Sequence, residues 1–287
     1  MNFWRTWLYV PANNEQRVEK ALNSRADCVI LDLEDAVSSQ EKDRARGLAV
    51  QTLEGSPGKP VLIRINAYGS PWFASDLEAL AAARMTAAFA GVRIPKVDNL
   101  SALSQAAQIL GSEIPLHPLL ESAQGISNLY AIASAQPSIA SLSLGETDLK
   151  ADLAMTLDVA LDPIRVSIIL ACRSAGLVPP PASVFTHLDD DLGLTESTQR
   201  MKSMGFFGRS VIHPKQIATV NSVFTPTAKE VETASALLDE VTSFADTGIS
   251  AFLRSDGTFV DPATVRQARD LLSLNRIIKT ELEDNSP

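Results

Sequence analysis

Cysteine, histidine and long apolar runs are all scarce in this sequence of 287 residues. The two cysteines, Cys28 and Cys172, have neither metal-ligand spacing nor a partner motif, so we expect buried free thiols in a reducing compartment. No apolar stretch approaches the roughly 20 residues that a membrane helix requires. The N-terminal residues lack the basic leader and long apolar core of a secretory signal, which predicts a cytoplasmic location.

Positive charge is also limited. The net charge is −9, and no run of Lys or Arg occurs, which argues against nucleic acid or an anionic membrane as the main partner. A small phosphorylated ligand held by a local basic patch is still compatible with this balance. The hydrophobic content of 45% and charged content of 21% are typical of a soluble globular protein.

Strand-like apolar runs alternate with segments of helical periodicity along most of the chain. The runs cover residues 6–10, 27–33, 60–66, 87–95, 114–120, 139–145, 178–185 and 206–212. Eight such units, with no Gly-rich phosphate loop after the first run, favour an α/β fold of the TIM (β/α)8 barrel type over an open doubly wound sheet. The seventh run is the weakest strand candidate, because Pro179, Pro180 and Pro181 cannot donate ladder hydrogen bonds.

The remaining residues predict a C-terminal extension. We expect a catalytic barrel domain over 1–222 and an extension over 223–287 that packs on the barrel or on a neighbouring subunit. Within the extension, the pattern predicts a helix after Pro226, a hairpin over 249–261 with an Asp256–Gly257 turn, and a last helix from Pro262.

Charged side chains gather where apolar runs stop. The stretches are ILDLEDAV (30–37), LIRINA (62–67), LLESAQG (119–125) and LGETDLKADL (144–153). The loops that follow parallel strands all leave from the same end of the sheet, and the active sites of barrels lie at that end. We therefore expect one pocket to contain Asp32, Glu34, Asp35, Arg64, Glu121 and Asp148. At least one of the three carboxylates in DLED is expected to face solvent.

Glu121 and Asp148 are the candidate metal ligands. Two hard oxygen ligands without accompanying His or Cys favour Mg²⁺, or Mn²⁺, over zinc. The alternative is that both residues cap the helices that follow, for which Asp148 is a credible candidate and Glu121 a poor one.

Arg64 interrupts an apolar strand, and a guanidinium in that position needs an acidic partner or an anionic ligand. A structural salt bridge to Asp32 or Asp35 and a clamp for a substrate carboxylate or carbonyl are both open, and they are compatible. Among the histidines, His117 is expected in the core and His187 on a surface loop. His213 closes the last strand at the face where ligands bind.

Seven ordered motifs resemble the citrate lyase beta-subunit family, which includes malyl-CoA and citramalyl-CoA lyases and belongs to the HpcH/HpaI aldolase superfamily. They are RTWLYVPANNEQRVEKAL (5–22), ADCVILDLEDAV (26–37), RIN (64–66), RIPKVD (93–98), ESAQG (121–125), LGETDLKADL (144–153) and GFFGRSVIHPKQI (205–217). The resemblance continues in GTFVDP (257–262). Two departures are VPA, where the family has VPG, and Asp98, where a glutamate is usual.

The resemblance implies roles for individual residues. Glu121 and Asp148 match the family's metal ligands, and Glu121 also counts among its substrate contacts. Arg64 matches its substrate-binding arginine and Asp35 an acidic group near the metal. Arg17 and Lys20 fall in the segment that meets the CoA phosphates. Asp261 resembles an aspartate that acts as acid or base from a neighbouring subunit, although Asp followed by Pro262 is also a helix N-cap pattern.

The activity implied by the resemblance is a Mg²⁺-dependent, reversible carbon–carbon cleavage. Its substrate is a 3-hydroxyacyl-CoA of the citramalyl-CoA or malyl-CoA type, its products are acetyl-CoA and a 2-oxo acid, and its assembly is a homotrimer or a multiple of trimers. The alternatives are a citrate lyase beta subunit acting on a carrier-bound citryl group, an aldolase acting on free oxo acids, and a non-catalytic acyl-CoA-binding subunit.

Overall fold

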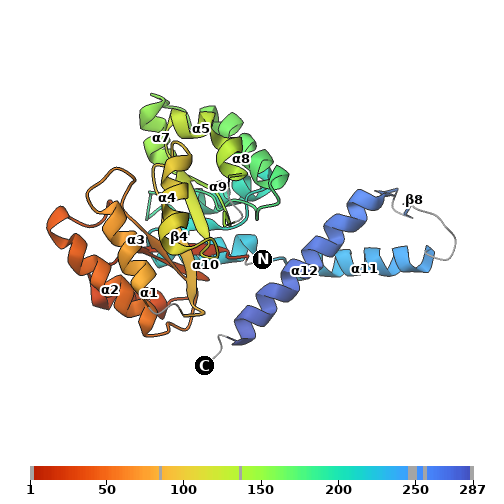
Figure 1. The fold of residues 1–287 in the computed structure, drawn as a ribbon. Helices are drawn as coiled ribbons and strands as arrows, with labels where there is room; N and C mark the ends of the chain where they lie inside the picture. The colour runs from red at the N-terminus through yellow and green to blue at the C-terminus, as the bar shows by residue number, and fades with distance from the viewer. Residues whose placement is uncertain (1–2, 84–85, 136–137, 245–250, 255–256, 285–287) are drawn as a thin grey trace. The chain divides into compact units, whose positions relative to one another are not determined.

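The computed structural model describes residues 3–83, 86–135, 138–244, 251–254 and 257–284 (Figure 1). The chain divides into two compact units, Met1–Val223 and Phe224–Pro287. Within the described residues, no helix is both long and apolar enough to cross a membrane.

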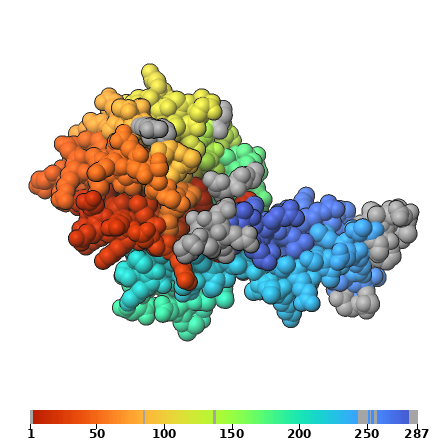
Figure 2. Space-filling view, turned by 90° about the horizontal axis from the view of Figure 1, so that it is seen from below, coloured from red at the N-terminus to blue at the C-terminus, as the bar shows by residue number. Residues whose placement is uncertain are grey.

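A parallel sheet of seven strands forms the centre of the first unit, in the order β6-β5-β4-β3-β2-β1-β7. The strands are β1 (Thr6–Pro11), β2 (Cys28–Asp32), β3 (Val61–Arg64), β4 (Phe89–Ile94), β5 (Leu116–Leu120), β6 (Ser143–Leu144) and β7 (Arg209–Val211). Because β7 pairs with β1, the beginning and the end of the unit lie side by side, and Figure 2 shows the red N-terminal segment against the cyan segment. The predicted α/β fold with a parallel sheet is confirmed.

Helices follow the strands in alternation (Figure 1). They are α1 (Glu15–Leu22), α2 (Lys42–Glu54), α3 (Phe73–Ala82), α4 (Leu100–Leu110), α5 (Ala123–Ser127), α6 (Leu129–Ala133), α7 (Glu146–Asp152), α8 (Asp162–Ser174), α9 (Asp191–Met204) and α10 (Lys215–Phe224), with short 3-10 turns at Ser39–Glu41 and Asp158–Leu161. Side chains of Asn14, Asn99, Ser122 and Asp190 cap α1, α4, α5 and α9. Three of these capped helices, α1, α4 and α5, each follow the carboxyl end of a strand.

The segment 178–185 is not the full strand that its sequence predicts. Only Ala182 forms a bridge, to Arg209, and the side chain of Ser183 donates to the carbonyl of Leu144 at 2.5 Å. Proline has no backbone N–H, so the three prolines before Ala182 leave too few donors for a ladder. Backbone hydrogen bonds still join this stretch to the segment of β7: Ala182 donates to Gly208 and accepts from Ser210, and Pro180 accepts from Phe207. The hydroxyl of Ser183 makes the contact with β6.

Register explains why acidic and basic residues meet at the strand ends. Asp32 of β2 is paired with Arg64 of β3, and Arg64 with Arg93 of β4. Residues in register on neighbouring strands project to the same face of a sheet. The three side chains thus lie in one row.

The opposite end of the sheet packs an aromatic cluster. Trp4 and Trp7 are buried with Cys28, Ile30 and Leu62. Cys28 and Cys172 are both buried free thiols, as predicted, and burial raises the pKa of Cys172 to about 12. Thiols with raised pKa values are poor nucleophiles, so these cysteines belong to the core.

The second unit consists of α11 (Ala228–Phe244), a two-stranded hairpin and α12 (Pro262–Asp284). The hairpin pairs β8 (Phe252–Leu253) with β9 (Phe259–Val260) in antiparallel register, which confirms the predicted hairpin and last helix. Gly257 takes φ +83 in the turn, and Asp256 lies outside the described residues. The core of the unit contains Ala234, Leu237, Val260 and Ala268.

Candidate active site

A cavity of about 310 Å³ opens at the carboxyl ends of the strands. Strand residues in its wall include Tyr9 of β1, Asp32 of β2, Arg64 of β3, Leu119 of β5, Leu144 of β6 and Ser210 of β7. Glu121, Glu146 and Asp148 also contribute charged groups to its lining. The predicted convergence of Asp32, Arg64, Glu121 and Asp148 is observed, whereas Glu34 and Asp35 lie beside the cavity as partners of Arg64.

Arg64 is tethered to Asp32 by two hydrogen bonds. Nε donates to Oδ1 at 2.7 Å, and Nη2 donates to Oδ2 at 2.6 Å. The side chain of Arg64 also stacks over the ring of Tyr9, 4.9 Å from its centroid. The contacts with Asp32 outweigh the cost of burial and raise the pKa of Arg64 above its usual range. A fixed, permanently charged guanidinium in a cavity wall is suited to bind a carboxylate or carbonyl oxygen.

The acidic loop after β2 is folded around this arginine. Asp32 accepts from the backbone N–H groups of Glu34 and Ala36, and Lys42 donates to the carbonyls of Leu33 and Glu34 at 2.7 Å each. Glu34 is buried and lies 3.1 Å from Arg64. Asp35 lies 3.5 Å from Arg64 with half of its side chain exposed, so one carboxylate of DLED faces solvent as predicted.

Lys96 links the acidic loop to Glu121. Its Nζ lies 2.7 Å from Glu34 and 3.3 Å from Asp35, while its backbone N–H donates to Oε2 of Glu121 at 3.0 Å. The residue adopts a left-handed backbone with φ 52, which costs a non-glycine residue roughly 1 kcal/mol. The strained backbone directs both donors of Lys96 towards acidic groups.

Glu121 directly follows β5 and is buried at the cavity wall. Burial first, and then the neighbouring charges of Glu34 and Asp148, raise its pKa to about 7, although the charge of Arg64 opposes them. A Cβ on Gly145 would lie 2.3 Å from Oε1 of Glu121, so only glycine leaves room for the carboxylate in this place. The sequence thus builds a cradle for one buried carboxyl group.

Glu121 and Asp148 differ from the other carboxylates of the cavity in lacking a basic partner. Asp32, Glu34 and Asp35 each pair with Arg64 or Lys96, but across the part of the chain that the structure describes neither Glu121 nor Asp148 forms an ion pair. No group of three or more His, Cys, Asp or Glu residues suitable for a metal occurs in those residues. A set of two carboxylates fits Mg²⁺, which fills its other positions with water and substrate oxygens.

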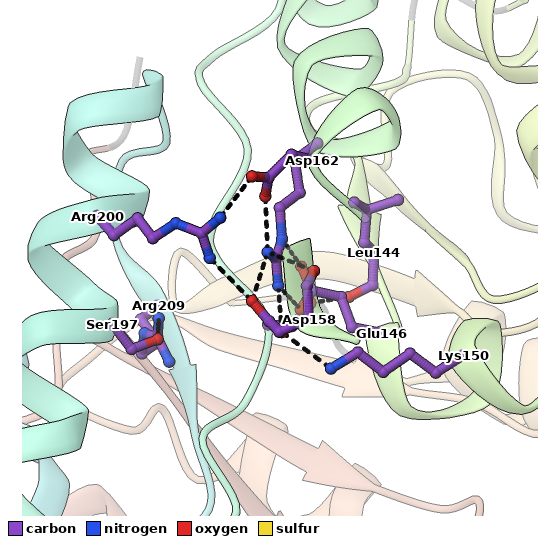
Figure 3. A network of polar contacts seen from close by, with 10 residues as sticks. Leu144, Glu146, Lys150, Asp158, Asp162, Ser197, Arg200 and Arg209 are labelled. Carbon is purple, nitrogen blue, oxygen red and sulfur yellow. Dashed lines mark hydrogen bonds and ion pairs between the residues drawn. The ribbon is translucent and has the colours of Figure 1, made fainter. Parts of the chain in front are cut away.

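A charged network fixes the first turn of α7, which carries Asp148. Arg165 donates from Nε to Oε1 of Glu146 at 2.8 Å and from Nη2 to Oε2 at 2.6 Å. Arg165 also binds Asp158 and Asp162, and Arg200 binds the same two aspartates from α9 (Figure 3). The hydrogen bonds from Arg165 lower the pKa of Asp158 below its usual range. Glu146 lies in the cavity wall, so this network supports that wall from outside.

Arg17, Lys20 and His213 belong to the first unit but do not line the cavity. Arg17 and Lys20 are exposed on α1, and Asn14 caps that helix through the N–H of Arg17. Asp261, in the second unit, caps α12, since the N–H and Oγ1 of Thr264 both donate to its Oδ1 at 2.8 Å. His213 accepts a hydrogen bond from the N–H of Lys215.

Two other sequence expectations have clear outcomes, and the structure also gives the contact of Asp98. His117 is a buried core residue bonded to Ser141 and to the carbonyl of Ala90, as predicted, and His187 is exposed. Asp98 accepts a hydrogen bond from Ser122, whose hydroxyl caps α5. Asp98 therefore shapes the turn that follows Glu121.

Sequence patterns did not single out Lys96, Tyr9 or Arg165. Lys96 lies inside the RIPKVD motif, and its charge close to the end of a strand could have indicated a place near the site. Tyr9 lies in an apolar strand, where an aromatic residue is typical of the core. Arg165 belongs to an ordinary amphipathic helix pattern, so nothing in its local sequence distinguishes it.

Comparisons with known proteins agree with this geometry. A (3S)-malyl-CoA thioesterase of Cereibacter sphaeroides is 35% identical over 240 residues, which cover 80% of each chain. A citrate lyase subunit beta of Leuconostoc mesenteroides subsp. cremoris is 31% identical and covers 96% of each chain. The crystal structure of CitE from Mycobacterium tuberculosis, in complex with magnesium, acetoacetate and coenzyme A, superposes with a TM-score of 0.78. It is 29% identical, and the match covers 96% of this chain and 98% of that one.

The profile of one protein family matches most of the first unit. Residues 5–214, which include all the strands β1 to β7 and the complete wall of the cavity, match the HpcH/HpaI aldolase/citrate lyase profile. The chain therefore belongs to the HpcH/HpaI aldolase/citrate lyase family.

Proposed function

We propose that this protein is a Mg²⁺-dependent carbon–carbon lyase that reversibly cleaves a 3-hydroxyacyl-CoA of the citramalyl-CoA or malyl-CoA type to acetyl-CoA and a 2-oxo acid. The observation that carries the proposal is the pair Glu121 and Asp148, which line one cavity with the tethered Arg64 and have no basic partner in the described chain. Family membership and the magnesium and coenzyme A named for the Mycobacterium tuberculosis structure support it.

Glu121 and Asp148 would hold the metal ion. When bound, Mg²⁺ supplies positive charge and a template for the carboxylate and oxygen of a 2-oxo acid. The buried position of Glu121 and its contact with the N–H of Lys96 fix one ligand, and the network of Arg165 and Glu146 steadies the turn that carries the other. Mn²⁺, which accepts the same oxygen ligands, is the expected substitute.

Arg64 and the acidic residues would supply the rest of the chemistry. Cleavage of a 3-hydroxyacyl thioester removes the hydroxyl proton and leaves negative charge on the enolate of acetyl-CoA. The guanidinium of Arg64, held by Asp32, would bind the oxo-acid fragment and offset developing oxyanion charge. A carboxylate must accept and return the proton, and Asp35 and Asp261 are the two candidates for this role.

The wider architecture belongs to the same proposal. The sheet would close as a (β/α)8 barrel with 178–185 as its seventh strand, and the C-terminal residues 223–287 would pack on the barrel or on a neighbouring subunit of a homotrimer or a multiple of trimers. Arg17 and Lys20, exposed on the helix after β1, would bind the CoA phosphates. We expect a cytoplasmic enzyme, which its two unpaired buried cysteines suit.

Two other activities have support. The thioesterase name of the Cereibacter sphaeroides relative favours hydrolysis of the thioester, in which water replaces CoA and a free thiol is released. A citrate lyase beta subunit would act on a citryl group held by a carrier, as the name of the Leuconostoc relative suggests. A non-catalytic acyl-CoA-binding subunit fits less well, because it would not need two carboxylates without partners.

Two incubations separate these activities. The protein is mixed with acetyl-CoA, Mg²⁺ and, in turn, pyruvate, glyoxylate or oxaloacetate, and thioesters are identified by mass while free thiol is measured. A lyase gives a thioester whose mass is that of acetyl-CoA plus the oxo acid, with no free thiol until a hydrolytic step follows. In the second incubation, with malyl-CoA, free CoA and malate without acetyl-CoA would instead favour the thioesterase. If no condensed thioester forms from any of the three oxo acids, the lyase proposal is overturned.

A further inference from the structure

Arg93 is fully buried and contacts two residues of the cavity wall, Tyr9 and Ser210. It comes from β4, next to Arg64 in register, yet it forms no ion pair with any carboxylate in the described part of the chain. Its hydrogen bonds go to three hydroxyl groups: Nη1 donates to Tyr9 at 2.9 Å and to Ser210 at 3.4 Å, and Nη2 donates to Ser143. A buried guanidinium without a counter-ion is costly, so its neighbours must be oriented to solvate it.

Tyr9 is therefore fixed as an acceptor towards Arg93. A phenol hydroxyl has one proton, which lies near the ring plane, and lone pairs for acceptance. Because Arg93 occupies one side of the oxygen, the proton must leave on the other side. Throughout the described residues, no acceptor for that proton occurs, although Tyr9 lines the cavity.

The ring of Tyr9 is fixed as well. The guanidinium of Arg64 stacks over it at 4.9 Å from the centroid, and that of Arg93 lies 5.7 Å from it. Two guanidinium groups thus lie close to one aromatic ring, and cations are attracted to the electron-rich ring face. The hydroxyl of Tyr9 is thereby held near Arg64 and can donate into the cavity without any rotation of the side chain.

We infer that the hydroxyl of Tyr9 donates a hydrogen bond to an oxygen of the 2-oxo-acid fragment that Arg64 holds, and that Arg93 is the positioning residue that orients this hydroxyl. The inference rests on the proposed function, because it assumes the oxo acid in the cavity. A neutral donor already oriented before binding costs no reorganisation when charge develops on the substrate oxygen.

The test compares Tyr9→Phe with Ser143→Ala. Tyr9→Phe keeps the ring and its stacking on Arg64 but removes the donor, and it also takes one acceptor from Arg93. Ser143→Ala takes an acceptor from the same guanidinium, but Ser143 is not in the cavity wall. Dissociation constants for pyruvate, glyoxylate, oxaloacetate and CoA are measured by calorimetry with saturating Mg²⁺, and folding is checked by thermal unfolding.

Tyr9→Phe is expected to raise the dissociation constant of the preferred 2-oxo acid about tenfold, as for one hydrogen bond to a charged group, and to leave CoA binding unchanged. Ser143→Ala is expected to bind the oxo acid within about twofold of the wild type. Unchanged oxo-acid binding in Tyr9→Phe would overturn the inference. Equally weakened oxo-acid binding in Tyr9→Phe and Ser143→Ala would overturn it too, because the loss of an acceptor for Arg93 would then explain both results.

A second substitution keeps the test decisive if Tyr9→Phe does not fold. A 3-fluorotyrosine at position 9 retains the acceptor for Arg93 and makes the hydroxyl a stronger donor, so oxo-acid binding should tighten about twofold. Unchanged or weaker binding would count against donation. If the wild type binds none of the three oxo acids, the proposed function itself is overturned and this assignment falls with it.

Discussion

Arg165 forms a bidentate ion pair with Glu146, donating from Nε to Oε1 at 2.8 Å and from Nη2 to Oε2 at 2.6 Å. Glu146 lies two residues before the candidate metal ligand Asp148. Arg165 is buried, whereas its neighbour Arg200 in the same network exposes 41% of its side chain. Burial decides how much such contacts matter, because solvent screens the exposed pairs.

Replacing Arg165 by Met should therefore destabilise the protein strongly. The change leaves Glu146 without its partner, and loss of one member of a buried pair costs about 3 kcal/mol. Arg200→Met, which removes an exposed arginine bound to the same two aspartates, should cost less than about 1 kcal/mol. Urea unfolding of the two variants measures their losses of unfolding free energy. Equal losses would contradict the expectation that the buried arginine contributes more than the exposed one.

His117 predicts a specific loss of stability in mild acid. Its pKa is lowered to about 3 by burial first and then by the charge of Arg93, whereas in the unfolded chain it is about 6.5. Below pH 6.5 the imidazole of His117 is protonated in the unfolded chain but stays neutral in the folded protein. Stability present above pH 6.5 is therefore lost as the pH falls towards 3.

The variant His117→Gln isolates this effect, because every other titrating group is common to both proteins. Between pH 7 and pH 5 the wild type should lose about 2 kcal/mol more unfolding free energy than the variant. Denaturant unfolding at both pH values gives the two losses. Parallel losses would mean that His117 is protonated in the folded state or remains inaccessible in the unfolded one.

The fold was predictable where one local pattern determined it. Each of the strands β2 to β7 falls within a predicted apolar run, and β1 extends one residue past its own, to Pro11, since a buried parallel strand needs apolar residues on both faces. The run at 178–185 was overestimated, because apolar character alone does not reveal how many N–H donors a proline-rich stretch lacks.

The site was predictable to the extent that parallel strands bring their carboxyl ends together. That rule places Asp32, Arg64, Glu121 and Asp148 at one cavity. It does not place Lys96, whose contacts depend on a left-handed backbone that lysine rarely adopts. It also misses Arg93, because a buried strand arginine that donates to hydroxyl groups on other strands leaves no local signal in the sequence.

Gly145 predicts a steric test of the Glu121 cradle. Gly145→Ala would put a methyl group 2.3 Å from Oε1 of Glu121, so the carboxylate must move. Mg²⁺ affinity should fall about tenfold or more, as when a group that orients a metal ligand is lost. Calorimetric titration with Mg²⁺ measures this change.

The matched control is Gly47→Ala, in α2, where the new Cβ would meet no described heavy atom within 4 Å apart from the adjacent residues and the backbone of its own helix. It should leave Mg²⁺ binding unchanged and stabilise the helix by up to about 1 kcal/mol, since alanine has the higher helix propensity. Wild-type Mg²⁺ affinity in Gly145→Ala would remove Glu121 from the set of metal ligands.

Asp261 separates a structural role from a catalytic one. Asn can accept the hydrogen bonds that cap α12 but has no titratable proton. If Asp261 is the acid or base proposed above, Asp261→Asn should lower kcat at least about 100-fold with little change in melting temperature. Normal turnover would leave the residue as a helix cap.

Mixed oligomers test whether Asp261 acts on a neighbouring subunit. Subunits with Asp261→Asn and subunits with Glu121→Gln are each expected to be inactive alone. In a verified mixed oligomer, some interfaces would combine one intact Asp261 with one intact metal site, so partial activity should return. An inactive mixture would argue for action within a single chain.

The central claim is that Glu121 and Asp148 support formation and cleavage of a carbon–carbon bond. The most direct measurement uses acetyl-CoA labelled with ¹³C at the methyl carbon and a 2-oxo acid labelled with ¹³C at its carbonyl carbon, incubated with Mg²⁺. We predict a one-bond ¹³C–¹³C coupling in the product of the wild type and none with Glu121→Gln or with excess chelator. Absence of the coupling with pyruvate, glyoxylate and oxaloacetate alike, or an undiminished coupling in Glu121→Gln, would contradict the account.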